Sequence, residues 1–386
     1  MKILTLSQIR AAEESAVICG AFSFAGLMKN AADVFCKIIS GKYEICGKNI
    51  VVVAGNGNNG GDGVVIAHNL KNMGAKVLLY MPLGACVSKP AIEYSDYIND
   101  IKMIDYVPEK CDILIDALFG IGLNRELSGT AAEVVSDMNM AQAVKISVDI
   151  PSGIDCNGKI CKNAFCADYT VTFIALKPCF VSPKTSDYCG EVTVADIGVK
   201  PNDYAYLTVE KPQFKKRLKN SHKGTYGTAL LITGSYGMCG AQILSAKAAL
   251  ATGVGIAKAR VCDKNYTAFC SSVPEAVTVP VDTNADGTPD VLDNRLFSAM
   301  SGANAILLGC GLGCSDEARS LVIRTLSFAK APVIIDADGI NCIANDISIL
   351  SKVKVPTVIT PHPKEMARLC RTDVEDIESN RFMYAK

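Results

Sequence analysis

The 386-residue chain has no tryptophan, only three histidines and a formal net charge of zero at neutral pH. Lysine plus arginine and aspartate plus glutamate number 39 each, so no excess of positive charge favours nucleic acid or an anionic membrane. The sequence also lacks a run of about 18 apolar residues, the length needed for a membrane-spanning helix. We therefore expect neither a nucleic-acid nor a membrane partner.

The N-terminus lacks the apolar run of a signal peptide, because Arg10, Glu13 and Glu14 interrupt it. We expect a cytoplasmic protein and a homo-oligomer. Cysteine is abundant at 17 residues, but no Cys-x-x-Cys pair occurs, and zinc sites usually combine such pairs with histidine. We interpret most cysteines as small core residues, for example Cys19 and Cys36 on apolar helical faces.

The length and composition predict two globular domains. Hydrophobic residues make up 49% and charged residues 20% of the chain, a composition typical of globular proteins. The chain is also longer than a typical domain with a single hydrophobic core. A stretch near residues 200–222 changes character, with two prolines and a basic cluster. We place the connection there, with one domain at residues 1–212 and the other at 213–386.

Both domains show strands that alternate with helical patterns. In the first half, helical spacing covers residues 7–40 and 63–73. Apolar runs predict strands at 51–53, 76–80, 113–116, 145–149 and 170–175. In the second half, strands within 228–235, 305–313, 332–339 and 357–363 accompany a helix at 242–255. This alternation predicts the α/β class: a Rossmann-like, doubly wound parallel sheet followed by a second α/β domain.

The strongest motif is GNGNNGGDG, residues 55–63, which follows a buried strand and opens a helix. Its glycines permit close approach of a ligand to the backbone, and a helix N-terminus favours an anionic group such as a pyrophosphate. Asn58, Asn59 and Asp62 add side-chain oxygens, which suit a hard cation such as K⁺. A tight Asn- and Gly-rich turn without function is the alternative.

Carboxylates follow two further strands, Asp116 in ILIDALFGIG and Asp149 in ISVDIPSG, with Ser152 beside the latter. One such aspartate is often only a helix cap. Because the carboxyl ends of parallel strands meet at one edge, these residues and the Gly-rich motif are expected to converge in one crevice.

GNGNNGGDG, DALFGIGL and VDIPSG, in this order and after LMKNAA at residues 27–32, resemble the family of NAD(P)H-hydrate epimerases. The resemblance covers roughly residues 1–210 and implies that Asp149 is catalytic, with Lys177 either positioning the ligand or lying on the surface. It implies a K⁺ site at Asn59, Asp116 and Ser152. It also implies a substrate site at Asn58, Asn59, Gly60, Gly61, Asp62, Gly120, Ile121, Gly122, Leu123, Asn124, Arg125, Glu126 and Asp149.

HKGTYGTALLITGS, LLGCGLG, DADGIN and TPHPKEM resemble the nucleotide-dependent NAD(P)H-hydrate dehydratase domain that is fused to this epimerase in many bacteria, and more loosely the ribokinase-like kinases. The resemblance implies that ADP or ATP and Mg²⁺ bind to a complete domain of this kind, with Asp336 and Asp338 toward the phosphates. Glu365 is expected to interact with a helix dipole. The hydrated cofactor would meet Ala241, Gly311, Gly313 and His362.

The family's later K-G-x-x-T and G-G-x-G-D segments do not occur in residues 223–386, so we expect an incomplete dehydratase domain without its nucleotide loop and general base. Two other functions remain open. A small-alcohol kinase of the ribokinase-like class would explain the second half but not GNGNNGGDG. A non-catalytic dinucleotide-binding or interaction protein would not require Asn59, Asp116 and Asp149. Binding of ATP and a sugar, or of a nicotinamide dinucleotide, would discriminate between these functions.

Overall fold

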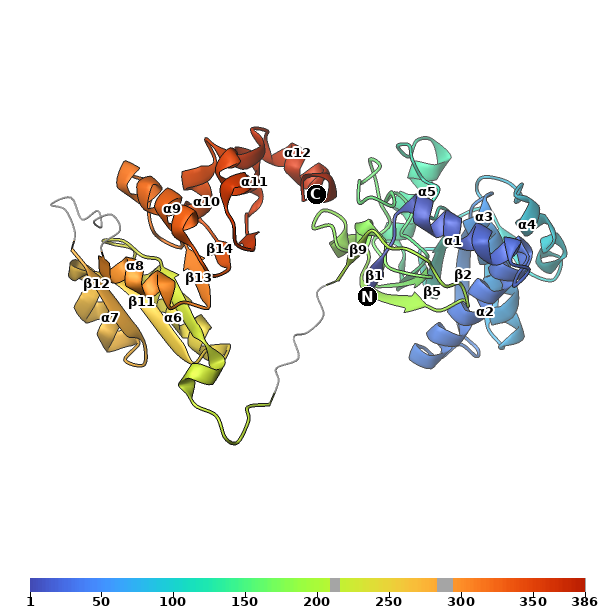
Figure 1. The fold of residues 1–386 in the computed structure, drawn as a ribbon. Coiled ribbons are helices and arrows are strands. Elements are labelled where there is room, and N and C mark those ends of the chain that lie inside the picture. The colour runs from blue at the N-terminus through green and yellow to red at the C-terminus, as the bar shows by residue number, and fades with distance from the viewer. Residues whose placement is uncertain (209–215, 283–293, 386) are drawn as a thin grey trace. The chain divides into compact units, whose positions relative to one another are not determined.

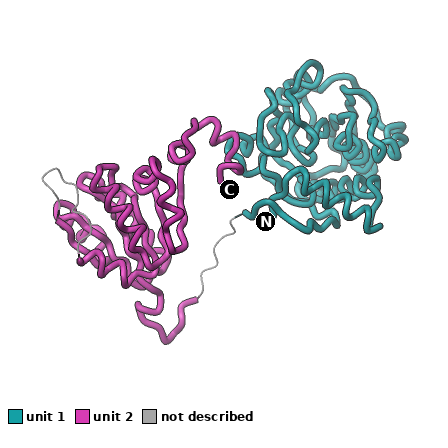
Figure 2. Tube along the Cα trace, turned by 45° about the horizontal axis from the view of Figure 1, so that its top comes forward, with its two compact units in different colours: residues 1–213 teal, residues 214–386 magenta. Residues whose placement is uncertain are grey.

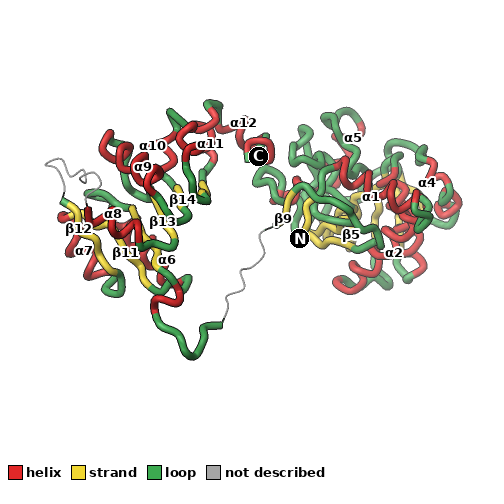
Figure 3. The backbone as a smooth tube through the Cα atoms, in the orientation of Figure 1, coloured by secondary structure: helices red, strands yellow, loops and turns green. Residues whose placement is uncertain are grey.

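The computed structural model describes residues 1–208, 216–282 and 294–385, and the chain divides into two compact units, residues 1–213 and 214–386 (Figure 2). The predicted boundary between residues 212 and 213 lies outside the described residues. Each unit is an α/β domain with its own parallel sheet, as predicted, and strands occupy the interior of each with helices around them (Figure 3). None of the described helices is long and apolar enough to cross a bilayer.

Unit 1 is built on a seven-stranded sheet in which every neighbouring pair is parallel. In spatial order its strands are β4 (Lys102–Ile104), β3 (Lys76–Tyr80), β2 (Asn49–Ala54), β5 (Lys110–Ala117), β6 (Gln142–Val148), β7 (Tyr169–Phe173) and β8 (Glu191–Ala195). A separate antiparallel pair joins β1 (Lys2–Ile3) to β9 (Tyr206–Leu207). The beginning and the end of unit 1 are therefore tied together.

Helices cover both faces of this sheet (Figure 1). They are α1 (Leu6–Ile18), α2 (Phe24–Lys42), α3 (Asn58–Asn72), α4 (Lys89–Ile92) and α5 (Thr130–Met140). In β2, Ile50 and Val52 pack with residues of α2 and α3, whereas Val51 and Val53 pack with residues of α5. Because successive side chains of a strand point to opposite faces, the continuous apolar run in this strand fills two cores.

The helical stretch predicted at residues 7–40 is two helices. Thr5 and Gln8 form a capping box at the start of α1, and Ser23 caps the start of α2. Cys36 is buried on α2 as predicted, but the prediction was wrong for Cys19, which is exposed because it is the C-cap residue of α1. Helix α3 begins at Asn58, within the GNGNNGGDG motif and five residues earlier than predicted.

Unit 2 contains a six-stranded parallel sheet, of which two strands were not predicted, β11 and β12. Its spatial order is β12 (Val277–Val281), β11 (Ile256–Cys262), β10 (Thr228–Ile232), β13 (Ala305–Leu308), β14 (Val333–Ile335) and β15 (Thr357–Ile359). Helices α6 (Cys239–Ala251) and α7 (Tyr266–Ser272) pack on one face. The other face carries α8 (Asn294–Ser301), α9 (Asp316–Phe328), α10 (Asp338–Ile343) and α11 (Pro363–Cys370), and the chain continues through α12 (Val374–Ser379) and α13 (Arg381–Tyr384).

The strand orders define one switch point in each unit. The chain runs outward from β2 through β3 to β4 and then restarts on the other side at β5. In unit 2 it runs from β10 through β11 to β12 and restarts at β13. In open α/β sheets the crevice beyond the carboxyl ends at a switch point is where ligands bind. GNGNNGGDG and Asp116 flank the first of these crevices.

Candidate active site

A cavity of about 470 Å³ lies at the carboxyl edge of the unit 1 sheet, a volume within the usual range for small-molecule sites. Residues after β2, β5, β6 and β7 line it, and α1 and α2 contribute further side chains. The predicted residues that line this cavity are Asn58, Asn59, Asp62, Gly120, Ile121, Gly122, Leu123 and Asp149. The three strand ends singled out in the sequence therefore do meet in one crevice.

Five of the predicted substrate residues are not among those that line the cavity: Gly60, Gly61, Asn124, Arg125 and Glu126. The two glycines instead permit close packing. A Cβ on Gly60 would lie 1.8 Å from the carbonyl oxygen of Gly55, and one on Gly61 would lie 2.6 Å from the Cβ of Ala91. The glycines thus seat α3 against neighbouring backbone and side chains, a role different from the expected close approach of ligand.

Asp149 follows β6 in the left-handed region, with a φ of 67°, which is unusual for a residue with a Cβ. Its Oδ1 accepts hydrogen bonds from the Lys177 Nζ at 2.5 Å, the Thr172 Oγ1 at 3.1 Å and the Phe173 amide at 3.4 Å. Its Oδ2 accepts none from the described part of the chain. One carboxylate oxygen is therefore fixed, and the other remains available beside the cavity.

Lys177 is 1% exposed, so the alternative that it is a surface lysine is wrong. Its ammonium group also donates to the Thr172 hydroxyl and, at 3.0 Å, to the Phe173 carbonyl. A buried charge of this kind is tolerated when it is paired and hydrogen-bonded. The ion pair with Asp149 consequently holds both side chains in place at the cavity wall.

Asp116 and Ser152 are both fully buried and contact each other directly. The Ser152 hydroxyl donates to the Asp116 Oδ1 at 2.6 Å, and the Ser152 amide donates to the Oδ2 at 2.7 Å. Burial raises the pKa of Asp116 to about 6, since its hydrogen bonds only partly offset desolvation and no described cation pairs with it. The Ser152 Oγ also accepts the Phe119 amide, which connects β5 to the loop after β6.

Asn59 lies in the first turn of α3, is 9% exposed, and its Nδ2 has no hydrogen-bond partner among the described residues. A Cβ built on Gly120, which follows Asp116 in the same loop, would lie 3.0 Å from the Asn59 Oδ1. This Nδ2 group is a hydrogen-bond donor and cannot bind a cation, so within Asn59 only the Oδ1 could be a cation ligand.

Two acidic residues in this cavity have pKa values displaced upward. Desolvation, reinforced by the charge of Asp149, raises the pKa of Glu13 to about 7. Desolvation, followed by the charges of Asp149 and Glu13, raises the pKa of Asp62 well above its usual value. Sequence reasoning missed Glu13, because a glutamate on a short amphipathic helix carries no local signal that it faces a cavity.

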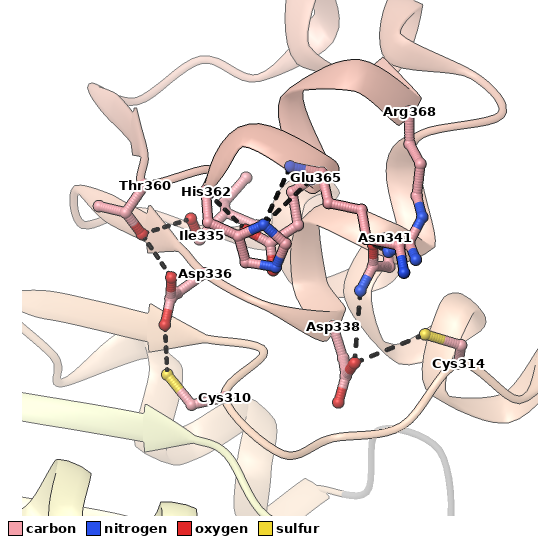
Figure 4. Close-up of polar contacts among 11 residues, drawn as sticks. Cys310, Cys314, Ile335, Asp336, Asp338, Asn341, Thr360, His362, Glu365 and Arg368 are labelled. Atoms are coloured by element: carbon pink, nitrogen blue, oxygen red, sulfur yellow. Dashed lines mark hydrogen bonds and ion pairs between the residues drawn. The ribbon is translucent and has the colours of Figure 1, made fainter. Parts of the chain in front are cut away.

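At the carboxyl edge of unit 2, the predicted residues make contacts within the protein (Figure 4). Asp336 accepts hydrogen bonds from the Cys310 thiol at 3.2 Å and the Thr360 hydroxyl at 2.7 Å. Asp338 accepts the Gly313 amide at 2.9 Å and the Cys314 thiol at 3.7 Å. In the described residues, no three or more His, Cys, Asp or Glu side chains are arranged to hold a metal ion.

Gly311 packs closely on Ala241, since a Cβ on the glycine would lie 2.8 Å from the alanine Cβ. His362 caps α11: its Nδ1 accepts the amides of Lys364 at 3.1 Å and Glu365 at 3.3 Å. The Glu365 Oε2 accepts the His362 amide at 2.8 Å, which completes a capping box. Glu365 therefore lies at the helix terminus as expected, and His362 has a structural contact that the sequence did not predict.

Comparison with known proteins finds one family match within each unit. Residues 25–179 match a family model described as YjeF-related protein N-terminus, and residues 229–386 match one described as NAD(P)H-hydrate dehydratase. Bifunctional NAD(P)H-hydrate repair enzyme Nnr from Thermofilum pendens is 30% identical over 409 residues, which cover 99% of this chain and 76% of that protein.

The protein of the same name from Dictyoglomus turgidum is 31% identical over 409 residues, covering 99% of this chain and 78% of its own length. A solved structure described as ADP/ATP-dependent NAD(P)H-hydrate dehydratase from Bacillus subtilis, co-crystallised with ATP and Mg²⁺, is 29% identical, with a TM-score of 0.36. It covers 45% of this chain and 57% of its own. The resemblance first indicated by GNGNNGGDG and VDIPSG is confirmed, and the chain belongs to the family of bifunctional NAD(P)H-hydrate repair enzymes.

Proposed function

We propose that unit 1 interconverts the two epimers of hydrated NADH and NADPH in the cavity at Asp149, and that the dehydratase domain performs the nucleotide-dependent dehydration when it also carries the nucleotide loop and general base that residues 223–386 lack. The observation that carries the first assignment is the buried ion pair between Asp149 and Lys177. It leaves the Asp149 Oδ2 without a described hydrogen-bond partner beside a cavity that residues at the start of α3 also line. That arrangement supplies a fixed carboxylate next to a site for an anionic dinucleotide.

The start of α3 suits the pyrophosphate of such a substrate. Gly57, at its N-cap, provides no side-chain hydrogen bond, so the first amides of a 15-residue helix are left for a ligand. Asn58 and Asn59 line the cavity at that point. With the pyrophosphate there, the hydrated nicotinamide ring extends toward Asp149.

Epimerisation can proceed by opening and closing of the ring, or by loss of the hydroxyl on the hydrated ring carbon and its return on the opposite face, and we propose the second route. The ring nitrogen supplies an electron pair as the carbon–oxygen bond breaks, and a cationic ring with a carbon–nitrogen double bond forms. The Asp149 carboxylate stabilises that positive charge and accepts the proton of the water that adds next. Lys177 and Thr172 keep the carboxylate oriented.

We further propose that K⁺ binds among Asn59, Asp116 and Ser152. The buried Asp116 carboxylate, which no described cation compensates, supports this assignment. The ion would offset the Asp116 charge and link the segments after β2, β5 and β6. Those segments carry the residues that line the cavity, so the expected effect of K⁺ is on binding and stability.

For a complete dehydratase domain we propose ADP or ATP with Mg²⁺ at the carboxyl edge near Asp336 and Asp338, and for unit 2 itself we propose hydrated cofactor near Ala241, Gly311, Gly313 and His362. Both carboxylates already accept internal hydrogen bonds. Mg²⁺ would therefore need phosphate oxygens and water to complete its octahedral shell, which is its usual mode of binding to nucleotides.

The epimerase assignment is tested with NADPH hydrate that is pure in one epimer. Chromatography follows its conversion with the protein and with buffer alone. We expect the rate of equilibration with protein to be clearly higher than the rate of the spontaneous reaction in buffer. Equal rates would refute the assignment.

A further inference from the structure

Glu13 lines the same cavity as Asp149 and Lys177 but comes from a different part of the fold. It lies on α1, before the first strand of the large sheet, whereas the other two residues follow β6 and β7. Its carboxyl group accepts no hydrogen bond from the described residues, and no described cation pairs with it. The mechanism proposed above gives this group no role.

We infer that Glu13 is a second proton-transfer residue of the unit 1 cavity, and that it protonates the hydroxyl that leaves the hydrated ring. The inference rests on the proposed epimerase function and extends it. An epimerisation has two half-reactions on opposite ring faces, and each needs its own proton transfer. A carboxyl group on α1 and a carboxylate after β6 provide two such groups in one cavity.

The charges around Glu13 favour its protonated form near neutral pH. On other elements, Asp149 and Asp62 are acidic and Lys177 is basic, while Arg10 and Glu14 flank it on α1. Desolvation and the negative charge of Asp149 outweigh Lys177 and Arg10, so the pKa of Glu13 rises to about 7. A general acid is most effective when its pKa lies near the working pH.

The proton balance closes over one turnover. Glu13 gives its proton to the leaving hydroxyl, which departs as water while the ring nitrogen forms the double bond to carbon. A water molecule then adds to the opposite face and loses a proton to Asp149. The cationic ring becomes neutral, Glu13 is left as a carboxylate and Asp149 is protonated. Transfer of that proton from Asp149 back to Glu13 through water resets the site, and the reverse reaction uses the two groups in exchanged roles.

The test uses the full chain and compares Glu13→Gln with Glu13→Asp. Glu133→Gln, an exposed glutamate on α5 outside the cavity, is the matched control. The rate of equilibration of a single NADPH-hydrate epimer gives kcat and KM between about pH 6 and about pH 8. Fluorescence titration with NADPH, which does not react, reports binding separately.

We expect wild-type kcat to fall as pH rises through about 7, because Glu13 loses its proton there. Glu13→Gln should lower kcat by about 10²-fold or more and abolish this pH dependence, with NADPH affinity unchanged. Glu13→Asp should retain the descending limb of the plot of kcat against pH, that is, the fall of kcat with rising pH, but at a shifted pH. Glu133→Gln should show the wild-type kcat and the wild-type pH dependence. A residue that only shapes the cavity would change KM or NADPH affinity instead.

If wild-type protein does not accelerate equilibration, the proposed function itself fails. If wild-type protein does, but Glu13→Gln keeps kcat within about threefold and retains the same descending limb, the inference about Glu13 is overturned. Should Glu13→Gln not fold, the Glu13→Asp variant decides: a displaced limb supports the inference, and an unchanged limb and kcat contradict it.

Discussion

The two units present polar side chains at the same kind of sheet edge, but the charged side chains differ between the units in their burial and hydrogen bonding. In unit 1, Asp149 is 7% exposed and lines the cavity, and Asp116 is fully buried at the end of β5. In unit 2, Asp336 and Asp338 bond to nearby thiol, hydroxyl and amide groups, and the side chain of His362 is 58% exposed. A shared topology therefore determines where a ligand meets the sheet without determining how deeply its charged partners are buried.

The difference originates in what precedes each sheet. In unit 1, α1 and α2 come before β2, and their residues line the cavity together with residues that follow the strand ends. In unit 2, a short 3₁₀ turn at Lys223–Tyr226 precedes β10. Enclosure excludes water, and in the resulting low-dielectric surroundings an unpaired charge is costly and pKa values shift. The perturbed acids Glu13 and Asp62 lie in this enclosed cavity.

The largest effect should follow loss of the Asp149 charge. We expect Asp149→Asn to lower epimerisation kcat by about 10²–10⁴-fold, since it removes the proton acceptor while keeping the shape. It also leaves the Lys177 ammonium buried without a counter-charge, at a cost of about 3 kcal/mol in the free energy of unfolding. Rate assays and urea unfolding measure the two effects.

Two variants separate these effects. Asp149→Asn combined with Lys177→Met removes both charges and should recover stability but not activity, while Asp187→Asn, an exposed aspartate outside the cavity, should behave as wild type. If Asp149→Asn turns over near the wild-type level, the Asp149 carboxylate stabilises the fold and has no role in catalysis.

A smaller effect is expected from K⁺. At a concentration about a hundred times its dissociation constant, a ligand specific for the folded state raises the free energy of unfolding by about 2.7 kcal/mol. We expect K⁺, compared with tetramethylammonium, to raise the Tm of the protein. Asn59→Ala should remove this difference, and it breaks no hydrogen bond seen in the described residues. Equal Tm values for wild type in the two salts would contradict the proposed site.

In unit 2 we expect His362→Ala to act mainly on the fold. Loss of an N-cap side chain typically costs about 1 kcal/mol, so unfolding of this unit should shift by that amount. Unit 1 should be unaffected, and its epimerisation rate serves as the internal control. An unchanged unfolding free energy would mean that the capping box contributes nothing to stability.

The smallest expected effect concerns separation of the units. Every residue that lines the cavity belongs to residues 1–213. That segment expressed alone should epimerise the hydrate within about twofold of the full chain, a difference of less than 1 kcal/mol in activation free energy. A much larger loss, with the fold of the segment intact by circular dichroism, would show that unit 1 needs the rest of the chain.

The sequence predicted the architecture better than the surroundings of the site. Apolar strands such as 76–80 and the acids after 113–116 and 145–149 were recognisable because buried parallel strands are continuously apolar. Convergence of Asp116, Asp149 and the Gly-rich motif followed from topology alone. The break between α1 and α2 was missed because both helices share one apolar spacing, and the break itself is set by the caps at Thr5 and Ser23.

Long-range contacts lay beyond sequence reasoning. Lys177 pairs with a residue 28 positions earlier, and Glu13 lines the same cavity as Asp149 only because α1 packs beside the sheet edge. The packing role of Gly60 likewise depends on the backbone at Gly55. Periodicity and motif spacing report on one element at a time, whereas these features depend on how separate elements pack.

We propose that the nicotinamide ring is held at Asp149 while the pyrophosphate meets the start of α3. A crystal structure of the protein with NADPH tests it most directly. We predict the ring carbon that carries the hydroxyl in the hydrate within about 3.5 Å of an Asp149 carboxylate oxygen, with the pyrophosphate at the amides of Asn58 and Asn59. NADPH bound with its ring away from Asp149, or bound outside this cavity, would contradict the account.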